Sequence, residues 1–510
     1  MHRYPRSFVL LLVAAGCAAA SPVARRPEVV RKFAEARPAS AAPAELLAPK
    51  LEAALPKIEA AAQEEFAKGA LPNLVVGLVA DGRLVWSKGF GRRDPAESEP
   101  PDSRSLFRIG SITKIVTGAS LLMLRDQGKL SLDDPAALYV PELGEVLYPS
   151  RDCPPITLRH LVTHTSGLPR VGKLDYARSD RDLAEADVVA ALAGAKLEFV
   201  PGTKTSYSNL AMAVAGLVVA RVSGMPYERF VQERLFAPLG IAHAVFQGSA
   251  ADPAHLAAGH KGSLAPYQPV PTSAHWRLGV GNPMGGLYLD LEDFARLAAF
   301  EMSAWPPRDE ADAGPLSRAS LRESQMPAAY GLGSPTFGVN WGVLEDSKLG
   351  HLVTHTGSTE DYSASIRLQP RRGLGALVMT GCGDADRASA LAKAILSLAF
   401  DAAPPPAPAL SPAFETVLGR VRKLLEAPDV AGIEGAFSPK FLESVPKEKL
   451  LALFKQVQQV GACTEHTVLV SEEGKAVVKL KCEKASLEIA MHAPAEPPHL
   501  LEGFYIKDAK

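Results

Sequence analysis

The alternation of apolar and polar positions predicts strands at both ends of a large region, with helices between them. Residues 51–68 have the apolar spacing of an amphipathic helix, and residues 74–80 and 84–90 are predicted to form two strands around the turn Asp81-Gly82. Strand character returns far along the chain, before a helical segment over residues 387–400. These late strands are expected at residues 339–343, 352–356, 362–368 and 374–380.

Helical spacing dominates the stretch between the two groups of strands. Long loops rich in Gly, Pro and Ser separate the predicted helices, which cover residues 112–127, 158–164, 184–192, 210–223 and 291–300. Strands from both ends with helices inserted between them predict one α+β domain, in which an antiparallel sheet joins distant segments.

Two proline-rich stretches bound this domain, which is expected to cover residues 51–401. Residues 21–50 are rich in Ala, Pro and Arg without periodicity, as in a tether, and residues 402–412 contain a run of prolines, as in a linker. Beyond the linker, residues 413–510 predict a small α+β accessory domain, with helices first and strands from residue 467 onwards.

The N-terminal residues have the order of a secretory signal. Basic residues precede an apolar run over residues 8–15 that is too short to span a bilayer, so residues 1–20 are expected to form a signal peptide. Gly16-Cys17 resembles the end of a bacterial lipoprotein signal, whose cysteine is lipidated; simple cleavage near Ala20 is the alternative. We expect an exported protein, either periplasmic or tethered to the outer membrane through Cys17, or otherwise secreted.

Five cysteines become four once Cys17 is set aside. Cys463 and Cys482 flank a predicted hairpin that brings its two ends together, so they are the expected disulfide pair in an oxidising compartment. Cys153 and Cys382 are expected to be free and buried.

Composition excludes several classes of function. The formal net charge is -1 and no basic run interleaves with aromatic residues, so nucleic-acid binding has no support. No phosphate-binding glycine loop occurs, and His160 and His164 lack the intervening glutamate that a zinc peptidase needs. We expect a small-molecule or peptide substrate, with no metal and no organic cofactor.

The segment from Ser111 to Lys114 has the form S-x-x-K. On a helix this spacing places a hydroxyl and an amine one turn apart on the same face, where a neutral lysine can take the serine proton. The same spacing recurs at Ser444 and Lys447, but with Pro446 between them. A strand or turn precedes Ser111 and an apolar helix follows it, so Ser111 is expected at a helix N-terminus, which favours developing negative charge. A helix-capping serine is the alternative interpretation.

Lys114 can act as a base only if its pKa falls, because a free lysine, with a pKa of about 10.4, is protonated at neutral pH. Burial or nearby positive charge has to lower that pKa. Tyr207, which forms the only Y-x-N of the chain with Asn209, supplies a phenol that can relay or accept the proton. Lys114 and Tyr207 are therefore the predicted partners in proton transfer.

Two similar segments are candidates for the wall of the site. Residues 354–358 end an apolar strand, where His355, Gly357 and Ser358 can line a cleft. Residues 163–167 look similar but follow a helix-like stretch. We interpret the first segment as site wall and the second as a structural loop.

The S-x-x-K at Ser111, the Y-x-N at Tyr207 and the segment over residues 354–358 occur in this order along the chain. Together they resemble the motifs of the serine β-lactamase and penicillin-binding-protein superfamily, in which S-x-x-K is followed by S-D-N and K-T-G. The Y-x-N at Tyr207 in place of S-D-N points to class C β-lactamases and to the related esterases and peptidases. The resemblance extends over about residues 55–400 and includes short motifs at residues 161–168, 201–203, 238–240 and 285–287.

The resemblance implies a β-lactamase/transpeptidase-like fold and a role for each motif residue. Ser111 would be acylated, Lys114 and Tyr207 would move protons, and the N–H groups of Ser111 and Ser358 would form an oxyanion hole. Asn209 would bind a substrate amide.

His355 is the main departure, because β-lactamases usually have lysine there and histidine is common among related esterases and peptidases. Lysine is a fixed charge for a substrate carboxylate, whereas histidine is mostly neutral near pH 7. Asp361 and Gly381 also depart, from glycine and asparagine respectively.

The departure at His355 favours hydrolase activity without efficient β-lactam turnover. Together with the N-terminal signal, it leads us to expect an exported serine hydrolase that acts on an ester or amide. A peptidoglycan D,D-peptidase or β-lactamase is the alternative enzyme. A penicillin-binding receptor or scaffold without turnover is the alternative that is not an enzyme.

Overall fold

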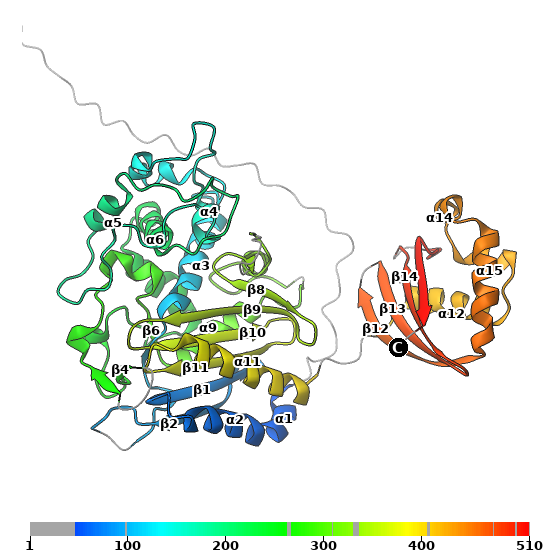
Figure 1. The fold of residues 1–510 in the computed structure, drawn as a ribbon, viewed down its shortest axis with the longest axis horizontal. Helices are drawn as coiled ribbons and strands as arrows, with labels where there is room; N and C mark the ends of the chain where they lie inside the picture. The colour runs from blue at the N-terminus through cyan, green and yellow to red at the C-terminus, as the bar shows by residue number, and fades with distance from the viewer. Residues whose placement is uncertain are drawn as a thin grey trace, which may run out of the picture. The chain divides into compact units, whose positions relative to one another are not determined.

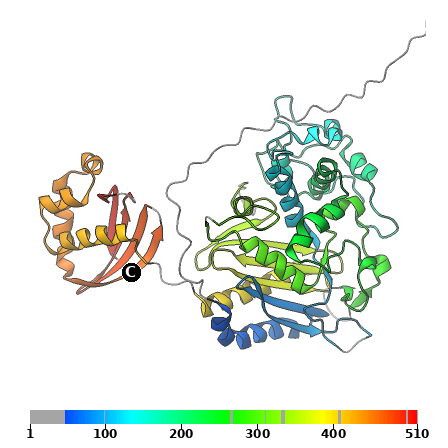
Figure 2. The same ribbon diagram turned by 180° about the vertical axis from the view of Figure 1, so that it is seen from behind.

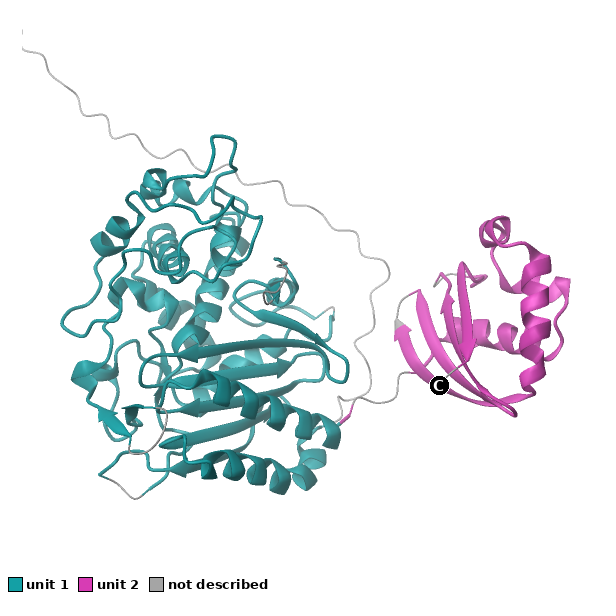
Figure 3. Cartoon of the chain, in the orientation of Figure 1, with its two compact units in different colours: residues 1–403 teal, residues 404–510 magenta. Residues whose placement is uncertain are grey.

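The computed structural model describes residues 46–508, except for residues 97–98, 263–266, 309, 330–335, 405–408, 473 and 495–496. The predicted signal, with Cys17, and nearly all of the predicted tether lie outside the described residues. The chain divides into two compact units between Ala403 and Pro404 (Figure 3). Each unit has its own hydrophobic core.

A seven-stranded antiparallel sheet forms the centre of the first unit (Figure 1). In spatial order, its strands are β2 (Arg83–Gly91), β1 (Asn73–Ala80), β11 (Leu374–Thr380), β10 (Ser363–Gln369), β9 (Gly350–Ser358), β8 (Gly342–Asp346) and β7 (Thr336–Phe337). β1 pairs with β11, so that Leu74 lies opposite Thr380 and the two ends of the unit share one sheet. The predicted antiparallel sheet from distant segments is confirmed.

Helices cover both faces of this sheet. α2 (Leu55–Ala67) and α11 (Ala385–Ala402) pack together on one face, whereas α9 (Leu291–Met302) lies across the other (Figures 1 and 2). Neighbouring residues of β1 point in opposite directions, so Val76 joins the core beneath α11 and Val75 joins the core beneath α9. Burial on both faces explains the continuous apolar run of β1.

The inserted helices enlarge the core on the α9 side. α3 (Thr113–Asp126) and α6 (Asn209–Ser223) contact each other at its centre, and both are buried along most of their length. β3 (Phe107–Arg108) leads into α3 where the sequence predicted a strand or turn, and it pairs with β6 (Tyr288–Leu289), which was not predicted. The remaining helices of this unit are α1 (Ala48–Leu51), α4 (Leu158–Val162), α5 (Glu185–Leu192), α7 (Tyr227–Phe230), α8 (Ala237–Leu239) and α10 (Arg318–Ser324), beside a small hairpin of β4 (Gly259–Lys261) and β5 (Gln268–Val270).

None of the described helices alone has the length and apolar composition needed to cross a membrane. Only α6 taken together with the following stretch Tyr227–Leu239 meets that criterion, as a pair bent by 70°.

One predicted strand is partly wrong. The strand expected over residues 339–343 begins only at Gly342, because Asn340 has a positive φ of 60° and donates its N–H to the carbonyl of Val162 at 2.9 Å. A residue in the left-handed region interrupts an extended strand. The apolar residues before Gly342 therefore form a turn that packs on α4, with Trp341 fully buried.

The second unit is a four-stranded antiparallel sheet with helices packed on one face. The helices are α12 (Pro412–Glu426), α13 (Val430–Ala436), α14 (Pro439–Ser444) and α15 (Lys447–Val457), and the strands are β12 (Cys463–Glu472), β13 (Lys475–Cys482), β14 (Ser486–His492) and β15 (Gly503–Asp508). Alternate residues of β13, such as Val478 and Leu480, are buried against Phe437 and Phe454. The unit therefore has the α+β character predicted for it.

A disulfide joins Cys463 to Cys482 at the open end of the hairpin formed by β12 and β13. Both remaining described cysteines are free. Cys382 is buried as expected, but Cys153 is only partly buried, because its loop lies at the surface.

We predict that a Cys463→Ser/Cys482→Ser double variant loses about 3 kcal/mol of stability in the second unit, because the disulfide closes a short loop and restricts the unfolded chain. Urea unfolding of the full-length protein, followed by tryptic digestion of the region after residue 412, measures this loss. Cys153→Ser is the matched control and should leave the transition unchanged. An unchanged transition in the double variant would contradict the prediction.

Candidate active site

Ser111 lies at the entrance to α3, in a turn over Gly110–Ile112 that leads from β3 into the helix. Thr113 fixes this turn, since its hydroxyl donates to the carbonyl of Gly110 at 2.7 Å and accepts the N–H of Leu287 at 3.2 Å. The Ser111 side chain is partly exposed and lines a pocket of about 380 Å³. The structure places Ser111 at a helix N-terminus, as the sequence predicted.

Lys114 follows one turn later and is fully buried. Its Nζ lies 3.0 Å from the Oγ of Ser111, donates to the carbonyl of Met284, and is 4.9 Å from the centre of the Tyr207 ring. Burial, and then the positive charge of Arg170, lower the pKa of Lys114 well below its usual value. The environment therefore favours the neutral amine that proton transfer from serine requires.

Strand β9 passes so close to the nucleophile turn that only glycine fits at two positions. A Cβ on Gly357 would lie 1.8 Å from the carbonyl oxygen of Ile109 and 2.9 Å from the nitrogen of Ser111. A Cβ on Gly110, which has a positive φ of 52°, would lie 2.7 Å from the nitrogen of Ser358. This approach brings the backbone N–H groups of Ser111 and Ser358 together, which is the arrangement that an oxyanion hole needs.

Tyr207 and Asn209 lie at the N-terminal end of α6, one residue before and one residue after its cap. The cap of this helix is Ser208, whose hydroxyl accepts the N–H of Ala211 at 3.0 Å and donates to the carbonyl of Pro169 at 2.9 Å. Because Ser208 is the cap, the side chain of Asn209 is not used for capping, and its Oδ1 is buried without a partner among the described residues. An unsatisfied amide oxygen beside Tyr207 can accept a hydrogen bond from a substrate N–H.

The segment over residues 163–167, interpreted from the sequence as a structural loop, also reaches the site. The ring of His164 lies against the ring of Tyr207, with centroids 4.3 Å apart, and is fully buried. Its Nδ1 accepts the N–H of Ser208 at 3.3 Å, so the neutral ring carries its proton on Nε2. Burial, reinforced by Lys114, lowers the pKa of His164 well below its usual value. His164 therefore packs against Tyr207 as a neutral ring. The sequence feature that could have indicated this role is the likeness of its Thr-His-Thr segment to the one that contains His355.

His355 lies on β9, and the centre of its ring is 6.4 Å from that of Tyr207. Its Nδ1 is 2.7 Å from the carbonyl oxygen of Thr356, and because a carbonyl only accepts, Nδ1 carries the proton. The buried Nε2 is then an acceptor, and it has no partner in the part of the chain that the structure describes. Burial, with Lys114 nearby, lowers the pKa of His355 to about 4, so the side chain is neutral near pH 7.

Arg170 is a second residue at the site that the sequence analysis did not single out. Its guanidinium carbon lies 5.2 Å from the centre of the Tyr207 ring, and the side chain lines the pocket. Burial raises the pKa of Tyr207, against the opposing effects of the Ser111 hydroxyl and the Arg170 charge. The phenol therefore stays protonated, which favours a proton relay through Tyr207 over a phenolate base.

Asp361 and Gly381, the two further departures from the family pattern, do not line the pocket. Asp361 is buried, accepts the hydroxyl of Thr359 at 2.8 Å and lies 3.3 Å from the Nε2 of His275. At Gly381 a Cβ would lie 2.2 Å from the carbonyl oxygen of Ala258, so no side chain fits. Both positions therefore act through packing within the fold.

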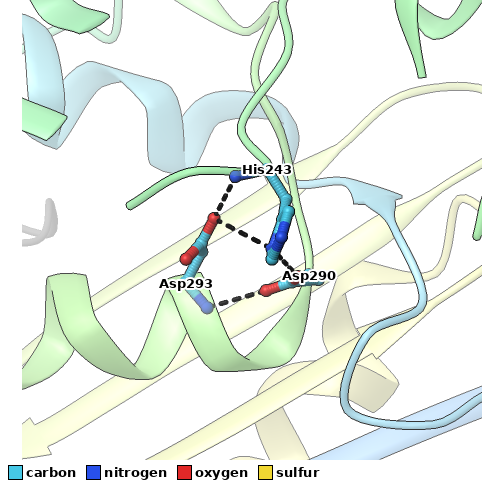
Figure 4. Close-up of side chains that lie close together, drawn as sticks. All are labelled: His243, Asp290 and Asp293. Carbon is cyan, nitrogen blue, oxygen red and sulfur yellow. Dashed lines mark hydrogen bonds and ion pairs between the residues drawn. The ribbon is translucent and has the colours of Figure 1, made fainter. Parts of the chain in front are cut away.

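One group of side chains in the described structure has metal-ligand character. The ligand atoms of His243, Asp290 and Asp293 all lie within 4.8 Å of one another (Figure 4). Asp293 accepts the backbone N–H groups of Ala242 and His243 and pairs with Arg296, while Asp290 caps α9 and bonds the His243 ring at 2.8 Å. These bonds account for the cluster, because they hold the loop at residues 242–243 against the start of α9.

Comparison with known proteins identifies a family and several relatives of this chain. A family model described as Beta-lactamase matches residues 56–400. Protein flp of Staphylococcus aureus (strain MW2) is 24% identical over 326 residues, which cover 63% of this chain and 62% of that protein. Beta-lactamase-like protein 2 of Dictyostelium discoideum is 30% identical over 265 residues, which cover 51% of this chain and 47% of that protein. The chain thus spans about three fifths or less of the length of these relatives.

Two solved structures share the fold. An octameric penicillin-binding protein homologue from Pyrococcus abyssi has a TM-score of 0.57 at 20% identity, covering 89% of this chain and 96% of its own. A beta-lactamase/D-alanine carboxypeptidase from Yersinia pestis, complexed with citrate, has a TM-score of 0.57 at 22% identity, covering 69% of this chain and 98% of its own.

We predict that Gly357→Ala slows modification of Ser111 by a fluorophosphonate by about 100-fold or more. The added Cβ collides with the carbonyl of Ile109 and displaces the Ser358 N–H, and loss of one oxyanion donor costs about 10²–10³ in rate. Gly144→Ala is the control, since a Cβ there meets nothing within 4 Å. Equal labelling rates in both variants, measured by intact mass, would contradict the prediction.

The rate of this labelling should rise with pH to a plateau whose midpoint lies well below about 10.4, the value for a free lysine. The sign follows from the lowered pKa of Lys114, because the neutral amine predominates above that pKa and is lost below it. Lys114→Arg, which stays protonated, should lower the rate by about 10²–10⁴-fold and abolish the plateau.

Lys447→Arg is the matched control for Lys114→Arg. Ser444 ends α14 and Lys447 begins α15, where it pairs with Glu434, so this second S-x-x-K does not lie on one helix. The substitution should leave the labelling rate and its pH profile unchanged. A wild-type midpoint near that of free lysine would contradict the lowered pKa of Lys114, and an unchanged rate in Lys114→Arg would show that Lys114 is not the base.

Proposed function

The chain belongs to the Beta-lactamase family, within the serine β-lactamase and penicillin-binding-protein superfamily, and we propose that it hydrolyses an ester or amide through an acyl-enzyme on Ser111. The observation that carries the proposal is the contact of 3.0 Å between the Ser111 hydroxyl and the buried amine of Lys114. A buried neutral amine within hydrogen-bond reach of a partly exposed hydroxyl is the arrangement that activates a nucleophile.

The proposed reaction follows from the positions of these groups. The Oγ of Ser111 attacks the substrate carbonyl as its proton passes to Lys114, and the N–H groups of Ser111 and Ser358 stabilise the oxyanion. Tyr207 relays the proton from Lys114 to the leaving alcohol or amine, whose departure leaves the acyl group on Ser111. Water, deprotonated through the same groups, then attacks the acyl-enzyme and restores the serine.

His355 argues against a β-lactam or a peptidoglycan terminus whose carboxylate needs a fixed positive charge on the β9 wall. A lysine at this position would offer a fixed positive charge to a substrate carboxylate, whereas His355 offers an unprotonated Nε2. A carboxylate cannot donate to that lone pair. The D,D-peptidase or β-lactamase alternative is therefore less well supported at this wall.

A binding protein without turnover is the other alternative. It has no need of a base beside the nucleophile, so the buried Lys114 in contact with Ser111 argues for turnover. Export, and a membrane tether through Cys17, stay proposals that rest on the N-terminal sequence alone.

The proposed function is tested by intact-mass analysis after exposure to a fluorophosphonate and, separately, to a penicillin. We expect one fluorophosphonate adduct on the wild-type protein, none on Ser111→Ala, and an unchanged adduct on the control Ser444→Ala. We expect no stable penicillin adduct and no penicillin turnover.

A stable penicillin adduct on Ser111 would favour the peptidoglycan-directed enzyme. A protein that takes neither reagent would contradict the proposed hydrolase. An adduct that persists in Ser111→Ala would show that another residue is the nucleophile.

A further inference from the structure

Arg170 is the only permanently charged side chain among the described residues that line the Ser111 pocket. The other polar groups of the lining are hydroxyls and a histidine whose pKa is about 4. No described carboxylate lines the pocket, so the one fixed charge among the described lining residues is this exposed guanidinium.

The backbone at Arg170 is held in place by the start of α6. The carbonyl of Arg170 accepts the N–H groups of Asn209 at 2.7 Å and Leu210 at 3.2 Å, and the preceding carbonyl, of Pro169, accepts the Ser208 hydroxyl. The guanidinium is therefore presented from an ordered helix end beside the reacting groups.

The guanidinium itself is engaged only weakly. It lies over the Tyr207 ring at 5.2 Å, and neither an ion pair nor a hydrogen bond to its nitrogens is found within the described part of the chain. Other arginines in the same connection are paired, as Arg178 is with Asp180 at 2.6 Å. An unpaired guanidinium offers several N–H donors in a fork that matches a carboxylate.

The opposite wall of the pocket, on β9, offers no charged group among the described residues. On β9, His355 carries its proton on Nδ1, which is committed to the carbonyl of Thr356, and Thr354 is bonded to the carbonyl of Ile366. The Ser358 hydroxyl is turned towards the carbonyls of Thr359 and Gly383. A substrate anion is therefore attracted to the α6 side of Ser111 and away from the β9 side.

We propose that the pocket selects esters or amides that carry a carboxylate, and that Arg170 binds this carboxylate on the α6 side of Ser111. The inference rests on the proposed hydrolase function and adds the substrate class and the residue that recognises it. Arg170 thereby supplies the fixed charge that a lysine in place of His355 would have supplied from the opposite wall.

The test compares kcat/KM for two matched pairs of activated esters. In the first pair the carboxylate is on the acyl group: mono-p-nitrophenyl adipate, whose chain is too long for ready attack of the carboxylate on its own ester, against its methyl ester. In the second pair it is on the leaving group: 3-acetoxybenzoate against its methyl ester. The preference is the ratio of kcat/KM for the charged ester to that for the neutral ester, and it is measured separately for each pair.

We expect the wild-type protein to prefer the charged ester in one of the two pairs, and the pair that shows it reveals which part of the substrate faces Arg170. Arg170→Gln should lower this preference by about tenfold, the effect of one partly exposed charged hydrogen bond. Arg170→Lys should retain part of the preference. Arg178→Gln, which removes the same charge outside the pocket, should retain all of it.

The preference of the wild-type protein should also fall as salt is added from about 0.01 to 1 M, since added ions screen an exposed pair. This measurement needs no variant, so it tests the inference even if Arg170→Gln does not fold. A preference that is absent in both pairs, insensitive to salt, or unchanged in Arg170→Gln would overturn it.

Arg170 also lowers the pKa of Lys114, and this second effect has its own signature. If Arg170→Gln slows both esters of a pair equally and moves the acidic limb of the pH profile upwards, Arg170 acts only on Lys114 and the inference is wrong. A wild-type protein that hydrolyses neutral esters without a preference leaves the proposed function standing. A protein inactive on all four esters and unlabelled by fluorophosphonate would refute the proposed function itself.

Discussion

A lysine amine buried without a counter-charge is the constraint on which the site depends. In the described structure the Lys114 amine contacts a hydroxyl, a carbonyl and an aromatic ring, and it forms no ion pair with a carboxylate. A charged amine in such surroundings is costly, so the fold stabilises the neutral form, which still donates to the carbonyl of Met284. Burial disfavours the protonated amine of Lys114, and it therefore leaves the amine with the free lone pair that a base needs.

The connection that ends at β6 holds this arrangement together. Its Met284 carbonyl receives the amine, and its Leu287 bonds both the Thr113 hydroxyl and the N–H of Ile109. A side chain on Gly286 would lie 2.0 Å from the Asn282 amide oxygen, so the connection can fold this tightly only with glycine. The Gly-Gly-Leu motif over residues 285–287, which the sequence analysis noted, thus helps to position the base although its residues do not line the pocket.

Local spacing was enough to predict Ser111 and Lys114 as neighbours, because one turn of helix brings their groups together, whereas Tyr207 was joined to them only through the Y-x-N motif and the family resemblance. Local spacing was not enough for His164 and Arg170, whose places beside Tyr207 depend on how a loop folds over the start of α6. The same limit applies to the fold. Long periodic segments were predicted well, whereas the strand before Gly342 was displaced by a tertiary bond between Asn340 and Val162 that no periodicity encodes.

Two neutral histidines explain how the site tolerates a basic amine and a single exposed cation. His164 carries its ring proton on Nε2 and His355 carries it on Nδ1, because one ring accepts a backbone N–H and the other donates to a backbone carbonyl. Each histidine has its pKa lowered by Lys114 as well as by burial, so a proton on any of the three disfavours a proton on the others. A lysine at position 355 would add a second cation beside the amine. With histidine there, the fixed charge of the pocket lies at Arg170, where solvent can reach it and a substrate can neutralise it.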